Sequence, residues 1–125
     1  MSMSGPYTGA MTIVLPVVET PASTCCSPIT GGVMSDEEAS SLAAKFKAMG
    51  DPTRIRLLSM VAAAEGGEAC VCDMNDQLDL SQGTVSHHLG LLVKAGLLTR
   101  TKRGIWSYYA LVPGALPALG DTLRA

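Results

Sequence analysis

Two stretches in the middle of the chain carry apolar residues at helical spacing, and each has a start and a stop signal. The first stretch begins at Ser35, whose partner three residues on is Glu38, and it ends at Gly50. A Ser with Glu at that spacing forms a capping box. The second stretch begins at Asp51-Pro52, a favoured helix start, and ends at residues 65–67. The apolar positions predict one buried stripe for each helix: Leu42, Phe46 and Met49 in the first, and Ile55, Leu57, Leu58 and Val61 in the second.

The next segment predicts two helices and a β-hairpin. A short helix over residues 71–78 is followed by a turn at Asp79-Leu80 and by a helix that Ser81 caps and Ala95-Gly96 closes. Residues 97–112 then change to a strand-like pattern around a turn that contains Gly104. In the last segment, 113–125, leucines recur at helical spacing, and Pro117 is expected to weaken this helix or confine it to the end of the chain.

A short helix, a turn, a capped helix and a hairpin make a winged helix-turn-helix. We therefore predict a mainly α fold with a β-hairpin wing. Residues 1–34 are rich in Gly, Pro, Ser and Thr, and they are interpreted as a flexible N-terminal arm that carries a Cys pair. Residues 35–125 are interpreted as the winged helix-turn-helix domain for DNA binding.

The net charge of −2 conceals a segregation of charge along the chain. Residues 1–80 carry ten acids and four bases, whereas residues 81–112 carry four bases and no acid. A stretch without carboxylates suits a surface that faces phosphates. The hydrophobic content of 47% argues against a disordered chain. The chain has no run of about 18 apolar residues, so we expect no membrane span.

The capped helix and the hairpin supply candidate DNA contacts. Short polar side chains near the start of the helix can reach base edges in the major groove, and basic side chains on the hairpin can contact the DNA backbone or the minor groove. The candidates are Ser81, Gln82, Thr84, Ser86 and His87 on the helix and Arg100, Lys102 and Arg103 on the hairpin. For His87 and His88, a surface or packing role is as plausible as a DNA contact. The aromatic residues 106, 108 and 109 are expected to pack within the hairpin.

Two segments resemble the ArsR/SmtB family of metal-sensing repressors. Residues 45–58, KFKAMGDPTRIRLL, are similar to the opening motif of that family, and residues 80–98, LSQGTVSHHLGLLVKAGLL, are similar to its recognition helix. The resemblance covers about residues 36–112. It implies a homodimeric repressor that dimerises through the domain of residues 35–125, binds double-stranded operator DNA and leaves it when a metal or metalloid binds. Gly83 and Gly90 depart from the family, which often has Pro and a long polar residue at these positions.

Four cysteines, at positions 25, 26, 70 and 72, are the candidate effector site. No basic residue occurs in 1–34, so we interpret the N-terminus as lacking a signal peptide and expect a reducing cytoplasm. Clustered thiols there are more often metal ligands or redox groups than disulfides. The segment Cys70-Val71-Cys72-Asp73 resembles the CVCD segment of the arsenic-, antimony-, cadmium- and lead-sensing members.

The spacing of the thiols sets a condition on the site. Residues i and i+2 of an ideal helix point about 200° apart, so Cys70 and Cys72 can share an ion only if the helix start is distorted or Cys70 lies outside it. Cys25-Cys26 lies about ten residues before the first helix, a length that spans at most roughly 33 Å. The arm can therefore reach the Cys70/Cys72 region of its own subunit or of the partner.

Thiolate-only ligation selects soft ions. As(III) or Sb(III) takes three thiolates, which Cys25, Cys26 and one of Cys70/Cys72 would supply; Cd(II) or Pb(II) would use three or four. We favour As(III)/Sb(III) as the inducer, with Cd(II)/Pb(II) as the alternative. A third hypothesis is a disulfide switch between the two cysteine pairs. An enzyme is disfavoured because the chain has neither a Cys-x-x-Cys pair nor a phosphate loop.

Overall fold

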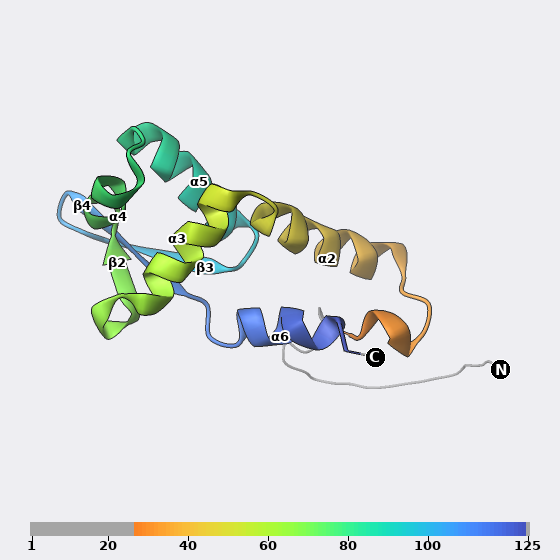
Figure 1. The fold of residues 1–125 in the computed structure, drawn as a ribbon. Helices are drawn as coiled ribbons and strands as arrows, with labels where there is room; N and C mark the ends of the chain where they lie inside the picture. The colour runs from red at the N-terminus through yellow and green to blue at the C-terminus, as the bar shows by residue number, and fades with distance from the viewer. Residues whose placement is uncertain (1–26, 125) are drawn as a thin grey trace.

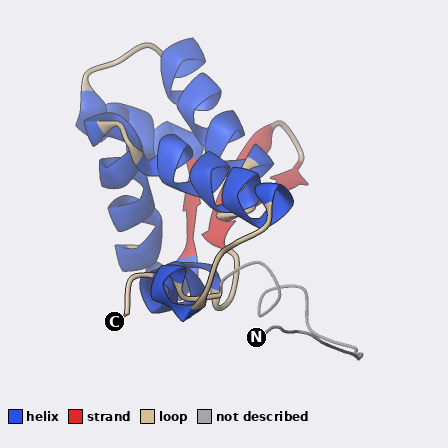
Figure 2. Ribbon diagram, turned by 90° about the vertical axis from the view of Figure 1, so that its right-hand side faces the viewer, coloured by secondary structure: helices blue, strands red, loops and turns tan. Residues whose placement is uncertain are grey.

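The computed structural model describes residues 27–124, in which helices predominate over a small sheet (Figures 1 and 2). The elements in chain order are η2 (Ile29–Gly31), α2 (Asp36–Met49), α3 (Pro52–Ala63), η3 (Glu65–Gly67), β2 (Glu68–Cys70), α4 (Val71–Leu78), α5 (Gln82–Lys94), β3 (Leu98–Arg103), β4 (Trp106–Leu111) and α6 (Ala115–Thr122). The helix-turn-helix is α4 and α5, and the wing is β3 and β4, as predicted. The short 3-10 turn η2 lies in the segment expected to be an irregular arm.

The helices begin at their predicted caps. The Ser35 hydroxyl accepts from the Glu38 amide at 3.1 Å, and the Ser35 amide donates to the Glu38 carboxylate at 3.0 Å, so the capping box is complete. The Asp51 carboxylate accepts from the amides of Thr53 and Arg54 at 2.9 and 3.2 Å. These bonds satisfy backbone donors that have no partner within the helix.

The core lies where α3, α4 and α5 pack against one another and against the sheet. Its innermost side chains have no solvent exposure: Leu57, Val61, Val85, Leu89, Leu92 and Leu97. The prediction that Ile55 belongs to the buried stripe of α3 is wrong, since this side chain is 53% exposed. At 100° per residue, Ile55 lies about 110° away from the direction shared by Leu57, Leu58 and Val61. Burial of these three leaves Ile55 outside the core.

The sheet has one more strand than the predicted hairpin. Its order is β2-β4-β3, and both pairings are antiparallel. In the register, Tyr108 of β4 lies opposite Thr101 of β3 on one side and Cys70 of β2 on the other. The strand β2 has only three residues, too few for an alternating pattern to stand out in the sequence.

The C-terminal helix differs from its prediction. Pro117 is the third residue of α6, so the helix includes the proline instead of starting after it. Pro is tolerated there because the first-turn amides of a helix have no acceptor within it. Leu123 lies just past the last helical residue and is 66% exposed. No helix within residues 27–124 is both long and apolar enough to cross a bilayer.

Candidate nucleic-acid interface

The first turns of α5 present several exposed polar side chains. The Ser81 hydroxyl accepts from the Thr84 amide at 3.1 Å and donates to the Thr84 hydroxyl at 2.8 Å, which fixes the start of the helix. The five helix residues predicted to face DNA are all exposed: Ser81, Gln82, Thr84, Ser86 and His87. The intervening apolar residues Val85 and Leu89 point into the core and anchor the helix. The polar side chains are thus held at a fixed orientation, as base readout requires.

A groove of about 500 Å³ separates α5 from the wing. Gln82 and Ser86 line its helix side, and Arg100 and Ser107 line its wing side. No acidic residue lines this groove. The structure therefore brings helix and wing candidates together on one surface, with a cationic group where a phosphate backbone would be favoured.

The three basic residues of the wing do not share one face. Successive side chains of a strand point to opposite faces, so Arg100 and Lys102 lie on one face and Arg103 lies on the other. Both Nη atoms of Arg103 donate to the Glu68 carboxylate of β2, with Nη2 to Oε2 at 3.0 Å. The guanidinium carbon also lies 4.7 Å from the ring centroid of Tyr108. This hydrogen-bonded pair lowers the pKa of Glu68 and raises that of Arg103. Arg103 is thus held away from the groove beside α5.

Cys70 and Cys72 meet the condition for sharing one ion. Cys70 ends β2 and is the N-cap of α4 with φ −78° and ψ 144°, so its backbone is extended and lies outside the helix. The interaction with the Cys70 thiol, followed by burial and by the nearby charge of Asp73, raises the pKa of Cys72. Cys70 is buried and Cys72 is half-buried. The two thiols are therefore neighbours at the junction of the wing sheet and the helix-turn-helix.

The other predicted ligands, Cys25 and Cys26, lie outside the described residues. Within residues 27–124, no cluster of three or more Cys, His, Asp or Glu side chains could hold a metal ion. The described chain begins at Ser27, and the Thr30 hydroxyl donates to the Arg124 carbonyl at 3.0 Å, just beyond α6. Figure 1 shows η2 beside the end of α6, at the opposite end of the molecule from β2 and α4.

Several residues that fix this arrangement were not identified from the sequence. Arg54 donates from Nη1 to His88 Nδ1 at 3.1 Å and from Nε to the Ala48 carbonyl at 2.6 Å. His88 thus ties α3 to α5, which is the packing role considered for it above. Glu68 and Tyr108 carry the contact with Arg103, and their partnership depends on β2. No local sequence pattern indicates that β2 pairs with β4, so the contact of Arg103 with Glu68 could not be predicted from the sequence.

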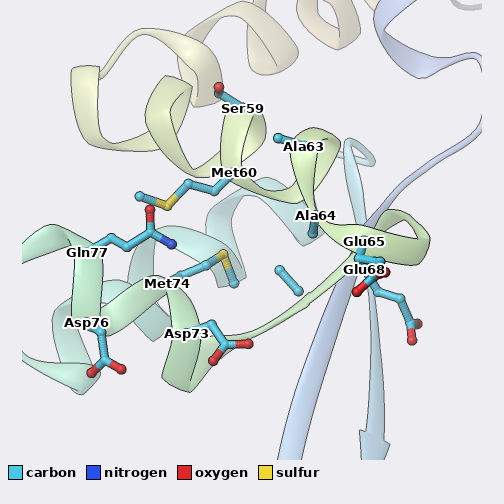
Figure 3. Close-up of a pocket in the computed structure, with 11 residues that line it drawn as sticks. Ser59, Met60, Ala63, Ala64, Glu65, Glu68, Asp73, Met74, Asp76 and Gln77 are labelled. Atoms are coloured by element: carbon cyan, nitrogen blue, oxygen red, sulfur yellow. The ribbon is translucent and has the colours of Figure 1, made fainter.

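A second groove, of about 870 Å³, lies between the end of α3 and α4 (Figure 3). Four acidic residues line it: Glu65, Glu68, Asp73 and Asp76. Carboxylates repel phosphates, so this side of the molecule is not a DNA surface. The acidic groove and the polar surface of α5 are thus distinct regions of one small domain.

Comparison with known proteins agrees with this arrangement. Residues 51–100 match the family described as "Bacterial regulatory protein, arsR family". The "Uncharacterized HTH-type transcriptional regulator MJ1325" of Methanocaldococcus jannaschii is 48% identical over 67 residues, which are 54% of this chain and 73% of that protein. The "Putative arsenical resistance operon repressor ArsR2" of Halobacterium salinarum is 46% identical over 85 residues, which are 68% of this chain and 69% of that protein.

A solved structure gives the same result for the fold. "Crystal structure of Possible transcriptional regulator for arsenical resistance" superposes with a TM-score of 0.56 at 32% identity, and the match covers 62% of this chain and 77% of that chain. Residues 51–100, which match the family, include α3, α4, α5 and the start of the wing. From this fold, this interface and these relatives, the chain belongs to the ArsR/SmtB family of DNA-binding transcription regulators, a family of regulators and not of enzymes.

Proposed function

We propose that this protein is a homodimeric repressor that binds a two-fold operator and releases it when cysteine thiolates bind As(III) or Sb(III). The observation that carries the proposal is the extended backbone at Cys70, which leaves two thiols side by side at the start of α4. Soft thiolate ligands favour soft ions, and a third thiolate would complete an As(III) site. The arsenical-resistance names of relatives support the same effector class.

We expect the dimer interface at the end of the molecule that is formed by η2 and α6. Three large apolar side chains are exposed there or close by: Ile29 at 49%, Val33 at 104% and Leu123 at 66%. Exposed apolar groups that gather at one end of a small domain favour association. In such a dimer, the two α5 helices would have to lie about 34 Å apart to enter successive major grooves.

Cys25 and Cys26 would complete the site, either in their own subunit or in the partner subunit. These cysteines precede η2, which lies at the opposite end of the molecule from Cys70 (Figure 1). A dimer formed through the η2 and α6 end would also leave the thiol pair of the partner at its far end. Completing the site would then require the segment before α2 to leave α6, whichever subunit holds the thiol pair.

Operator release follows from where the thiol pair lies. Cys70 belongs to the sheet that carries the wing, and Cys72 belongs to the first helix of the helix-turn-helix. Thiolates that hold one ion would draw these two elements and the arm into one arrangement, which would differ from the arrangement that fits DNA. Coupling of this kind is typically worth about 1–3 kcal/mol, or about 5- to 150-fold in affinity, and DNA must weaken inducer binding by the same factor.

The primary test is fluorescence anisotropy of the DNA upstream of the gene, with reduced protein under anaerobic conditions. Sodium arsenite and then Cd(II) are titrated into the complex. We expect arsenite to release the DNA at about one equivalent per subunit, with Cd(II) weaker. A variant with all four cysteines changed to Ser should bind DNA and ignore arsenite, while the matched control Asp73→Asn should still respond.

The remaining outcomes separate the alternatives. Release by Cd(II) alone would favour the four-thiolate site. Release by an oxidant, without any ion, would favour the disulfide switch. An undiminished arsenite response in the variant without cysteines would refute the thiolate site altogether.

A mixed dimer tests the exchange of arms between subunits. One protomer carries Cys25→Ser and Cys26→Ser, and the other carries Cys70→Ser and Cys72→Ser. If the site crosses the interface, this heterodimer retains one complete site and binds one arsenite. If the site lies within one subunit, the heterodimer has none and does not bind arsenite, which would overturn the cross-subunit arrangement. Each mutant homodimer is the control that lacks a complete site in either case.

A further inference from the structure

One contact of the wing crosses the whole width of the sheet. Arg103 on β3 reaches over Tyr108 on β4 to the carboxylate of Glu68 on β2. In antiparallel pairs, residues directly opposite each other point to the same face. The register places Thr101, Tyr108 and Cys70 in one such row, and Glu68 lies two residues before Cys70. Glu68, Cys70, Tyr108 and Arg103 therefore share one face of the sheet.

The contact is better suited to orientation than to stability. The Arg103 and Glu68 side chains are 52% and 33% exposed, and exposed ion pairs contribute little to folding. A bidentate pair does, however, impose a defined geometry on both partners. The Tyr108 ring beneath the guanidinium fixes the path of the Arg103 side chain between the two outer strands.

This geometry differs from that of a DNA contact. Arg100 lines the groove beside α5, whereas Arg103 points to the opposite face and has both Nη groups bound to a carboxylate. To reach a phosphate, Arg103 would have to break this pair and leave the face of Tyr108. Pairing of Arg103 with Glu68 and binding of Arg103 to a phosphate therefore exclude each other. Arg103 can still affect DNA binding through the orientation that it gives the wing.

We propose that Arg103 is a positioning residue that, through Glu68 and Tyr108, fixes the wing to the strand that ends at the thiol pair. The brace, defined as Glu68, Tyr108 and Arg103, holds the hairpin so that Arg100 and Lys102 face the DNA together with α5. Because Cys70 lies opposite Tyr108 in the register, a rearrangement of β2 around Cys70 also changes the support of the wing. This last step rests on the proposed thiolate function; the role of the brace in DNA binding does not.

Two substitutions separate a brace from a phosphate contact because the two roles predict opposite results. Arg103→Lys keeps the charge but cannot form the bidentate pair. Lys still binds phosphates as a point charge, so a phosphate contact would survive this change. Glu68→Gln removes the charge and one of the two acceptor oxygens, so the bidentate ion pair is lost although the amide oxygen can still accept one hydrogen bond. A brace would be lost in both variants, whereas a phosphate contact would be freed by Glu68→Gln.

The measurement is the operator Kd by anisotropy at fixed salt for the full chain, the two variants and their double variant. We expect each single variant to weaken binding by about two- to fivefold, the range of an ion pair of this exposure, and the double variant to add nothing. The matched control is Glu65→Gln. Glu65 is an exposed acid three residues earlier in the same groove, and no ion pair to it occurs within residues 27–124 (Figure 3).

The control accounts for the general effect of removing one negative charge, which should strengthen DNA binding slightly for either glutamate. Tighter binding by Glu68→Gln than by Glu65→Gln, with Arg103→Lys equal to wild type, would overturn the proposal and make Arg103 a phosphate contact. Unchanged binding in both single variants would overturn it too. Circular dichroism and the melting temperature of each variant show whether the fold is intact.

A titration with arsenite tests the link between the brace and the thiol pair. In the brace variants, the factor by which arsenite weakens operator binding should fall below that of the wild type and of Glu65→Gln. An unchanged factor would refute the link. If the wild type itself ignores arsenite, the proposed effector fails, while the effects of Glu68→Gln and Arg103→Lys on operator binding still decide the role of the brace.

Discussion

Two glycines near each other in the chain should respond to the same substitution with opposite signs. Gly90 lies inside α5 with ordinary helical geometry, is exposed, and has open space where a Cβ would be. Gly96 follows the end of α5 with φ +82°. A Cβ at Gly96 would meet only the end of the Lys45 side chain, at 3.9 Å. Packing is therefore permissive at both positions, and only the backbone conformation differs.

The expected magnitudes follow from that difference. Alanine is favoured over glycine by about 0.8–1.0 kcal/mol in a helix interior, so Gly90→Ala should raise the free energy of unfolding by about 1 kcal/mol. An L-residue in the left-handed region costs roughly 1–2 kcal/mol, so Gly96→Ala should lower it by about that amount. In a domain of this size, 1 kcal/mol corresponds to about 4–8 °C in Tm.

The assay is thermal and urea unfolding followed by circular dichroism for wild type, Gly90→Ala and Gly96→Ala. All three are measured at one protein concentration, because dimerisation makes Tm depend on it. The m-value in urea should stay the same, since neither change alters the surface buried on folding. Operator affinity serves as a second control, because an Ala at Gly90 adds only a methyl group to the groove beside α5.

A loss of stability in Gly90→Ala would refute the reasoning. It would mean that the open space at Gly90 is filled in solution, for example by a closer approach of the wing to α5. Equal shifts of the same sign at both positions would also refute it, because the left-handed geometry of Gly96 would then have no energetic consequence.

Three further predictions concern the caps, the core and an ion pair. Asp51→Ala should lower the free energy of unfolding by about 1 kcal/mol in urea denaturation, because the Thr53 and Arg54 amides lose their acceptor. Leu89→Ala should lower it by about 2–5 kcal/mol, since this side chain is fully buried, whereas Ile55→Ala, at an exposed apolar position, should cost much less. The Arg103 guanidinium lowers the pKa of Glu68 below its ordinary 4.5, so the pair stabilises the fold above that pH and its contribution is lost as pH falls through the lowered pKa. Acid titration followed by circular dichroism should therefore show a shallower loss in Glu68→Gln than in wild type, and identical curves would contradict this.

Local signals explain what the sequence predicted well. The caps at Ser35, Asp51 and Ser81 depend on residues within three positions of each other, and all three are confirmed. The helix-turn-helix likewise follows from the spacing of apolar residues in α4 and α5. These features depend only on residues close together in the chain, so they can be predicted from a single sequence.

The two incorrect predictions concern Ile55 and Pro117. Their outcome depends on which elements cover a helix or on where the helix begins. Ile55 has the spacing of a core residue relative to Leu58, but the faces of α3 that become buried are set by α4, α5 and the sheet. Pro117 is compatible with a helix once the helix starts two residues earlier, and the start is fixed by the turn at Gly114, whose φ is +78°. Neither fact follows from the periodicity of the segment itself.

The strand β2 has consequences for both candidate sites. Its three residues, Glu68, Ala69 and Cys70, have no strand signature, and they become a strand only because β4 offers an edge for pairing more than thirty-five residues later. That pairing keeps the backbone at Cys70 extended and so brings its thiol beside Cys72, which an ideal helix would not do. The same pairing places Glu68 where Arg103 can reach it across Tyr108. One short strand therefore supports the thiol pair and the wing together, and a change at either end of β2 is transmitted to the other through only three residues of backbone.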